Sequence, residues 1–303
     1  MARLLFAHAH PDDETLATGV ALGHYVSRCH SVEVLTATLG DEGEVIPAEL
    51  AHLTADRDDM LGQFRRGELA AAMARLGVGH RLLADGEGPD GMPRYRDSGM
   101  AGSPAASHPR AFAAADVDDA AARVAAYLRA ERPDVVVTYD AGGGYGHPDH
   151  VQTRRVALAA IAGLAEPERP SRVYEIVTPQ SWAREDREWL AQHVPADSGL
   201  HVPTLDEPYA VSVVPDEVVT HVVIDDAARG RQAHALAAHR TQVSVFDGYY
   251  ALSNDIAHRL AGREAFVRLD PATGVRLPAE RAGEWQRGLL GEGTTEPVGA
   301  PGC

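Results

Sequence analysis

Near its start the chain reads Leu4-Leu5-Phe6-Ala7-His8-Ala9-His10-Pro11-Asp12-Asp13-Glu14. The apolar residues predict a buried strand over 3–9. The helical pattern that follows begins at Asp12 and Asp13, where carboxylates accept hydrogen bonds from free backbone N–H groups. Two imidazoles and three carboxylates therefore stand together where the first predicted strand ends. Residues of this kind at a strand end indicate a metal or catalytic site.

A second run, Tyr145-Gly146-His147-Pro148-Asp149-His150, follows another apolar strand, predicted over 134–139. The elements expected between the two runs alternate, with helices over 14–28, 47–76 and 116–128, and strands over 32–38 and 82–83. This alternation predicts an α/β fold, a Rossmann-like and mostly parallel sheet with right-handed crossovers and helices on both faces. Ligands of such sheets bind beyond the carboxyl ends of the strands. The two runs are therefore expected to meet in one site.

The pattern weakens after residue 165. Prolines separate the short strands predicted there, which cover 173–177, 209–214 and 218–224. We therefore expect a Rossmann-like catalytic core over 1–165 and a smaller, irregular α/β subdomain over 166–303 that contributes to the substrate pocket. A helix over 226–239 is expected to pack back on the core. The Gly-, Pro- and Ser-rich stretch 86–109 is too long for an ordinary connection and predicts a pocket wall or lid.

The 303 residues include 45% hydrophobic and 24% charged residues, as in an ordinary globular protein, and no run approaches the length of a membrane span. A net charge of −16 argues against nucleic acid and anionic membranes as partners, because both select basic surfaces. It fits a small neutral or cationic ligand. Cys29 and Cys303 offer neither a disulfide framework nor a Cys-rich zinc site, so we expect a cytoplasmic protein. Composition leaves open whether the chain forms a homo-oligomer.

Zinc prefers imidazole and carboxylate ligands, and a catalytic zinc keeps three protein ligands and one open position for water. His10, Asp13 and His150 supply such a set, so we predict that they bind one zinc ion per chain. Ferrous iron accepts the same ligands, and the sequence does not choose between the two metals.

Side chains beside the predicted ligands have the chemistry of a hydrolytic site. Asp12 adjoins a ligand and is expected to act as general base on the attacking water. His147 lies within one helical turn of another ligand and is expected to donate a proton or a hydrogen bond to a developing oxyanion, with Asp149 holding its ring. Tyr145 is a further predicted donor to the oxyanion.

Two motifs of the chain form one recognisable pattern when they are taken together, namely Ala9–Glu14 and His147–His150. Further matching runs are Thr38–Ile46, Arg96–Gly102, Val135–Asp140, Gly143–Val151, Ala237–His239, Thr241–Val243 and Ala251–Asn254. Together these runs resemble the PIG-L/LmbE-like family of zinc-dependent de-N-acetylases, and closely the branch of it that acts in mycothiol biosynthesis. The resemblance is poor over 165–223, which leaves the distal half of the pocket undefined.

The resemblance implies that the chain removes acetate from the glucosamine nitrogen of 1-(2-acetamido-2-deoxy-glucopyranosyl)-myo-inositol, a small amino-sugar inositol. It implies the same ligands and the same catalytic residues as above. It also adds substrate-binding residues. Arg65 and Asp97 would contact sugar or inositol hydroxyls, Glu44 and Asn254 would lie near the pocket, and Met100 would serve as lid packing or as a wall against the sugar.

Other functions stay open at this point. A mycothiol S-conjugate amidase of the same family would use the same zinc chemistry on a larger amide, although Gly146 and the run Arg96–Met100 favour the deacetylase. A deacetylase of another N-acetylglucosaminyl compound in secondary metabolism is a second alternative, because the stretch 165–223 could reshape the pocket. A purely structural metal site would not need Asp12 or His147. Phosphoester hydrolysis usually uses a second metal or a basic clamp, and no basic cluster lies near either motif.

Overall fold

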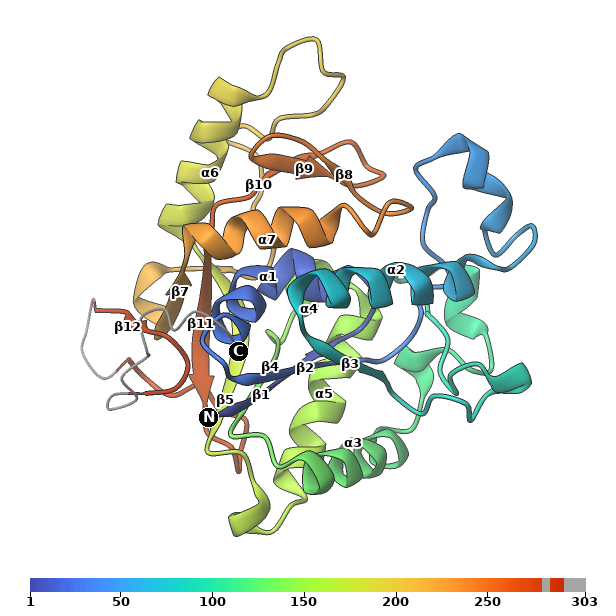
Figure 1. Ribbon diagram of the computed structural model, residues 1–303, viewed down its shortest axis with the longest axis vertical. Helices are drawn as coiled ribbons and strands as arrows, with labels where there is room; N and C mark the ends of the chain where they lie inside the picture. Colours follow the sequence, from blue (N-terminus) through green and yellow to red (C-terminus); the bar gives the residue numbers. More distant parts are fainter. Residues whose placement is uncertain (280–283, 292–303) are drawn as a thin grey trace.

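A computed structural model describes residues 1–279 and 284–291 and places nine strands in one central sheet (Figure 1). The strands are β1 Arg3–His8, β2 Ser31–Thr36, β3 Gly79–Leu82, β4 Val135–Tyr139, β5 Arg172–Pro179, β6 Val213–Val214, β7 His221–Ile224, β11 Arg263–Leu269 and β12 Gln286–Arg287. Their order is β12-β7-β11-β5-β4-β1-β2-β3, and β6 pairs with β5. Strands β3, β2, β1, β4 and β5 run parallel, and β11 is antiparallel to both of its neighbours. The predicted Rossmann-like, mostly parallel α/β sheet is confirmed.

The other elements surround this sheet. A small antiparallel sheet contains β8 Ser244–Val245, β9 Tyr249–Ala251 and β10 Ala257–Arg259. The α-helices are α1 Asp13–Val26, α2 Leu61–Leu76, α3 Val117–Glu131, α4 Gly143–Gly146, α5 Pro148–Ala162, α6 Gln180–His193 and α7 Asp226–Leu236. Short 3₁₀ helices cover Ala48–Leu53, Pro89–Gly91, Pro104–Ser107, Phe112–Ala114, Glu166–Glu168 and Asp216–Val218. Within the described residues, no helix combines the length and the apolar character needed to cross a membrane.

The core lies on both faces of the central sheet, because successive side chains of a strand point to opposite sides. Leu4 and Phe6 of β1 belong to the cluster packed under α1, α2 and α7. Leu5, between them, belongs to the cluster packed under α3 and α5. Figure 1 shows α1, α2 and α7 above the sheet and α3 and α5 below it, so the expected helices on both faces are present.

The single helix predicted over 47–76 is wrong. The segment forms the 3₁₀ helix Ala48–Leu53, and α2 begins only at Leu61. Between them Asp59 adopts a left-handed φ of 53°, and its carboxylate pairs with Arg96 at 2.6 Å. Gly77 ends α2 with a φ of 76°, a conformation that glycine adopts without the strain of a Cβ.

The chain after residue 165 contributes to the same sheet. Strand β5 pairs with β4 along its length and β11 pairs with β5, so no boundary of the sheet coincides with residue 165. Helix α7 packs against α1 and α2, on the core. The strand expected over 209–214 is limited to the two residues of β6. The division of the chain into two domains stays a prediction, and part of the second domain lies outside the described residues.

Two long elements of this region were not predicted, and neither were the short strands β8, β9, β10 and β12. Helix α6 buries Trp182 and Leu190, but five successive charged residues at 184–188 interrupt the apolar pattern between them. Strand β11 reads Arg263-Glu264-Ala265-Phe266-Val267-Arg268-Leu269, with charged residues that hide its apolar character. Helix α6 is stabilised by packing against neighbouring strands, and β11 by pairing with β5 and β7, rather than by local sequence preference.

Phe266 tests whether the two parts of the chain unfold together. It is fully buried in β11 and shares one core cluster with Leu4 and Phe6 of β1. Phe266→Ala is expected to destabilise the protein by about 3–5 kcal/mol in one transition, because it opens a cavity in a shared core. Urea unfolding followed by both fluorescence and circular dichroism measures this. The exposed Val275→Ala should shift the free energy of unfolding by less than about 0.5 kcal/mol. Two transitions, of which Phe266→Ala moves only one, would show independent parts.

Candidate active site

His10, Asp13 and His150 converge beyond the carboxyl ends of β1 and β4, which are parallel neighbours. His10 Nδ1 lies 3.3 Å from Asp13 Oδ2, and His150 Nε2 lies 3.2 Å from the same oxygen. The two nitrogens are 3.3 Å apart. A tetrahedral zinc with bonds of 2.0–2.1 Å requires ligand atoms about 3.3–3.4 Å apart. The three atoms have this spacing, so the donor set fits a metal ion, and the cluster can bind one.

Hydrogen bonds hold two of these side chains in the orientation that a metal requires. His150 Nδ1 donates to the carbonyl of Gly143 at 3.1 Å, which leaves Nε2 with its lone pair toward the cluster. Asp13 Oδ2 accepts from the Tyr139 hydroxyl at 2.8 Å. The Tyr139 ring also stacks on His150, with 4.2 Å between ring centroids. Tyr139 was not singled out from the sequence, although its place as the last residue of β4 was a signal.

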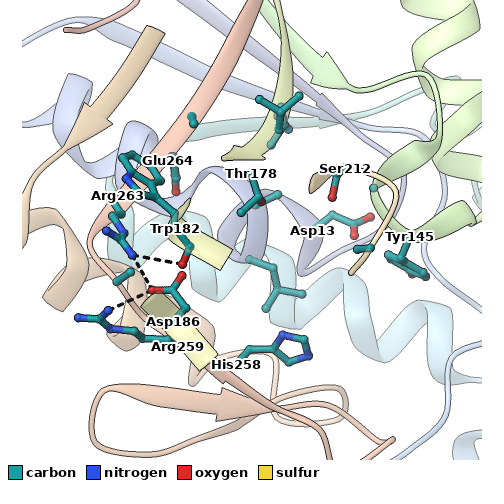
Figure 2. A pocket seen from close by; sticks show the side chains of 18 of the residues that line it. Asp13, Tyr145, Thr178, Trp182, Asp186, Ser212, His258, Arg259, Arg263 and Glu264 are labelled. Atoms are coloured by element: carbon teal, nitrogen blue, oxygen red, sulfur yellow. Dashed lines mark hydrogen bonds and ion pairs between the residues drawn. The ribbon is translucent and has the colours of Figure 1, made fainter. Parts of the chain in front are cut away.

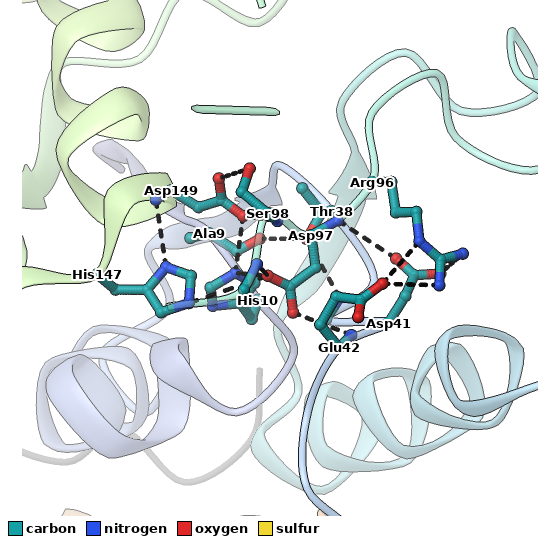
Figure 3. Close-up of polar contacts among 12 residues, drawn as sticks. Ala9, His10, Thr38, Asp41, Glu42, Arg96, Asp97, Ser98, His147 and Asp149 are labelled. Atoms are coloured by element: carbon teal, nitrogen blue, oxygen red, sulfur yellow. Dashed lines mark hydrogen bonds and ion pairs between the residues drawn. The ribbon is translucent and has the colours of Figure 1, made fainter. Parts of the chain in front are cut away.

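The third side chain, His10, is held by carboxylates (Figure 3). Its Nε2 lies 3.3 Å from Asp149 Oδ2 and 3.5 Å from Asp97 Oδ1, so Nε2–H donates there and Nδ1 is left for the cluster. Ser98 fixes Asp149 through its backbone N–H, at 2.9 Å, and its hydroxyl, at 2.6 Å. Ser98 also was not singled out from the sequence.

We expected the Asp149 side chain to orient His147, but its carboxylate has a different partner. Its carboxylate lies on His10, and only its backbone N–H reaches His147, donating to Nδ1 at 3.2 Å. The reason is local: His147 is the N-cap of α5, so its ring accepts from the first free N–H of the helix. The Nε2 of His147 lies 3.9 Å from Asp97 Oδ1.

The charged groups in and around the cluster favour binding of a cation. Burial alone would lower the pKa of His10, but Asp97, Asp13 and Asp149 outweigh it and raise that pKa well above its ordinary value. Burial opposes ionisation of Asp13, but His150 and His10 hold the pKa of its carboxyl well below the usual range. Buried carboxylates therefore stay charged around the histidines, and a metal cation would compensate them.

Asp12 occupies the left-handed region of the backbone, with a φ of 105° and a ψ of −36°. Such a conformation costs a residue with a side chain about 1–3 kcal/mol. Its carboxylate is buried, and Asp12 Oδ2 lies 3.3 Å from Arg65 Nη2. Burial raises the pKa of Asp12 to about 6, against the opposing effect of Arg65. A carboxyl with this pKa is a competent proton acceptor near neutral pH.

Tyr145 lies at the rim of the cluster. Gly144 and Gly146 flank it with φ values of 76° and 96°, which residues with side chains rarely adopt, so the glycines permit the turn that presents it. The Tyr145 ring centroid is 5.0 Å from that of His150 and 6.1 Å from that of His147. Its side chain is 57% exposed and therefore accessible to a ligand.

The predicted substrate-binding residues separate into two groups. Arg65 and Asp97 are buried: Arg65 donates to the carbonyls of Gly40 and Pro11 as well as facing Asp12, and Asp97 faces His10. The other three lie farther out in the described structure. Glu44 and Asn254 are exposed, with Asn254 closing its own turn, and Met100 is half-exposed.

A cavity of about 360 Å³ adjoins the cluster (Figure 2). Asp13, Tyr145 and His150 line the side toward the cluster. Elements from the second half of the chain, α6, β10 and β11, line the opposite side with Trp182, Asp186, His258, Arg259, Arg263 and Glu264. None of the five predicted substrate-binding residues is among the described residues that line it.

Charged side chains in the distal wall are paired within the wall. Asp186 accepts hydrogen bonds from Arg259 at 3.0 Å and from Arg263 at 2.7 Å. Glu264 accepts from two backbone N–H groups of α1 at 2.7 and 2.9 Å, and burial raises its pKa to about 8. Because the Asp186 charge is compensated by two arginines, and Glu264 with this pKa is mostly uncharged near neutral pH, the cavity suits a neutral ligand better than an ionic one.

Fold and site together define a class of protein: an α/β fold with a His/Asp cluster suited to a metal ion at the carboxyl edge of a parallel sheet and a further buried carboxylate, Asp12, beside it. Residues 5–161 match the family model described as "PIG-L: GlcNAc-PI de-N-acetylase". The chain belongs to this PIG-L family of de-N-acetylases.

Curated relatives extend the similarity over nearly the whole chain. The 1D-myo-inositol 2-acetamido-2-deoxy-alpha-D-glucopyranoside deacetylase of Thermobifida fusca (strain YX) is 44% identical over 274 residues, covering 88% of this chain and 92% of the relative. The deacetylase of the same name from Rhodococcus jostii (strain RHA1) is 45% identical over 284 residues, covering 90% and 94%. A solved structure, the antimicrobial reagent A40926 pseudoaglycone deacetylase, has a TM-score of 0.52 at 20% identity over 88% of this chain and 96% of its own, which shows the shared fold.

Asp149→Asn tests how the carboxylate behind His10 tunes the metal site. The variant keeps the shape of the side chain and removes the negative charge that faces His10 Nε2. Zinc affinity is expected to fall about 10- to 100-fold, measured by competition with a chromophoric chelator. Asp134→Asn, at the opposite end of β4, is the matched control, because the Asp134 carboxylate accepts from the Arg3 backbone N–H at 2.9 Å, far from the cluster. Equal affinity of Asp149→Asn and wild type would contradict this account of the site.

Proposed function

We propose that the protein hydrolyses the N-acetyl group of 1-(2-acetamido-2-deoxy-glucopyranosyl)-myo-inositol, giving glucosaminyl-inositol and acetate in the cytoplasmic biosynthesis of mycothiol. The observation that carries the proposal is the similarity, at 44% identity over 88% of the chain, to deacetylases named for this substrate. A neutral glycoside also fits the paired charges of the cavity wall.

His10, Asp13 and His150 are the proposed ligands of one zinc ion per chain, and ferrous iron suits the same donor atoms. The mutual spacing of 3.2–3.3 Å supports this assignment. When bound, such a metal polarises an amide carbonyl and lowers the pKa of water. Asp97 and Asp149 hold the His10 ring in the proposed arrangement.

Asp12 is the proposed general base. Its carboxylate takes a proton from the water that attacks the amide carbon and returns it to the nitrogen as the C–N bond breaks, so that the amine and acetate separate. Arg65 keeps that carboxylate oriented. Arg65 therefore acts on Asp12 in this proposal rather than on the sugar. Sugar contacts of Glu44, Asn254 and Met100 stay predictions, since all three lie on exposed or half-exposed surface.

His147 and Tyr145 are the proposed donors to the oxyanion. Because Nδ1 of His147 accepts the Asp149 N–H, the hydrogen of the neutral ring sits on Nε2. Burial, with His10 and His150 nearby, lowers the pKa of His147 to about 4, so the neutral ring is the form present at neutral pH. It stabilises negative charge by a hydrogen bond, and the Tyr145 hydroxyl adds a second one.

A substrate comparison tests the proposed function. Amine release by zinc-loaded enzyme is measured with the N-acetylglucosaminyl-inositol, with a mycothiol S-conjugate and with N-acetylglucosamine alone. We expect the highest kcat/KM for the first compound. Preference for the conjugate would assign the protein to the amidase function instead, and turnover of none of them would refute the proposed substrate.

Asp12→Asn tests the base. The variant keeps the side-chain size but cannot accept a proton, so kcat is expected to fall about 10²- to 10⁴-fold. Zinc content, measured by mass spectrometry of the metal, should match wild type because Asp12 is not a proposed ligand. Turnover near wild type would remove Asp12 from the mechanism.

The same assignment predicts the acid limb of the pH profile. A base must be ionised, and the pKa of Asp12 is about 6, so Asp12 is active above that pH and protonated below it. The kcat/KM is expected to fall about tenfold per pH unit below about pH 6. Zinc content is followed at each pH, because acid also displaces metal from histidines. A flat profile down to pH 5 in metal-loaded enzyme would contradict the assignment.

A further inference from the structure

We propose that Glu14 and His239 are positioning residues that hold Asp12 in the backbone conformation from which it acts as base. The proposal rests on the function assigned to Asp12 above. The side chains of both residues make their hydrogen bonds away from the three cluster atoms, and His239 lies 225 positions from Glu14 along the chain.

The first step is the backbone of Asp12. Its φ of 105° is unfavourable for a residue with a side chain, so surrounding contacts must maintain it. Glu14 Oε2 accepts the backbone N–H of Asp12 at 3.0 Å. Glu14 is fully buried, so this contact is shielded from water. The Glu14 carboxylate therefore fixes the N–H side of Asp12, while Arg65 faces its carboxylate.

The second step is the orientation of Glu14 itself. Its other oxygen, Oε1, accepts from the Thr15 hydroxyl at 2.6 Å and from His239 Nε2 at 3.0 Å. His239 is fully buried, and its Nδ1 has no hydrogen-bond partner in the part of the chain that the structure describes. Its ring thus directs Nε2–H at Glu14. The hydrogen bond from His239 therefore fixes the plane of the Glu14 carboxylate, which accepts the backbone N–H of Asp12.

The third step is the anchoring of His239. It follows α7, and the segment after it is tied to α2: Thr241 donates to Glu68 through its N–H at 2.9 Å and its hydroxyl at 2.6 Å. The carbonyl of Thr241 also accepts from Ile46 N–H at 2.9 Å. The segment after α7 is therefore fixed relative to α2, and the hydrogen bond from His239 to Glu14 relates the position of Asp12 to it.

A second contact between α1 and α7 provides a control that distinguishes positioning of Asp12 from general packing of the two helices. His24 of α1 pairs with Asp225, the N-cap of α7, at 2.8 Å, so it also joins α1 to α7. His24 lies at the other end of α1, away from Asp12. His24→Ala is thus a matched control: it loosens the same helix pair and leaves the hydrogen bonds of Asp12 intact.

The test combines kinetics with a readout that needs no substrate. Glu14→Ala is expected to lower kcat about 10- to 100-fold, and His239→Ala by a smaller factor, with KM and zinc content unchanged. Glu14→Gln and His239→Gln, which keep an acceptor and a donor, should recover part of the loss. His24→Ala should lower the unfolding temperature without lowering kcat.

Double variants show whether Glu14 and His239 influence kcat through Asp12. In Glu14→Ala, adding His239→Ala should have no further effect on kcat, and in Asp12→Asn neither change should matter. The backbone N–H of Asp12, followed by hydrogen exchange in NMR spectra, should exchange faster in Glu14→Ala and His239→Ala, and not in His24→Ala.

Unchanged exchange of the Asp12 N–H in both variants would overturn the positioning role, whatever the substrate. If kcat also fell in His24→Ala, and in every variant only in proportion to the loss of stability, the positioning role would be overturned as well. Absence of wild-type turnover on the acetylated glycoside would instead refute the proposed function, and the exchange measurement would still decide the role of Glu14 and His239.

Discussion

The parallel pairing of β1 with β4 is the constraint on which the site depends. Leu4 lies opposite Val135 and Phe6 opposite Val137, so both strands end at one edge of the sheet. The turn after β1 carries His10 and leads into α1 at Asp13, and the segment after β4 leads to His150 in α5. Packing on both faces maintains this register, because a slip of one residue would turn every side chain to the wrong face. The spacing of the three ligand atoms is therefore a consequence of the core.

Burial then gives neighbouring carboxylates different chemistry. Asp13 stays ionised because two histidines face it, whereas burial raises the pKa of Asp12 to about 6. One carboxylate is suited to hold a cation and the adjacent one to accept a proton, a division of roles that is set by environment rather than by residue type. The unusual backbone of Asp12 serves the same end, because it turns this carboxylate toward Arg65 while Asp13 faces the histidines.

The chain after residue 165 completes the site around the ligands. Helix α6 and strands β10 and β11 supply the distal wall of the cavity (Figures 1 and 2). The segment that follows α7 brings His239 to Glu14. Changes in these elements would reshape the ligand space without altering the three cluster residues. The cluster residues follow the ends of β1 and β4, whereas the distal wall belongs to later elements, so the cluster and the ligand space can vary separately.

The sequence by itself determined the α/β class, the two strand ends and the identity of the clustered residues, because strand periodicity and His/Asp chemistry are local properties. It mispredicted the helix over 47–76 and missed α6 and β11, since an Arg96–Asp59 pair and long-range packing override local preference there. Only the tertiary structure decided that Asp149 faces His10 and not His147, that Arg65 faces Asp12, and that His239 reaches Glu14. Such contacts join residues far apart along the chain, and their geometry is set by how helices pack on the sheet.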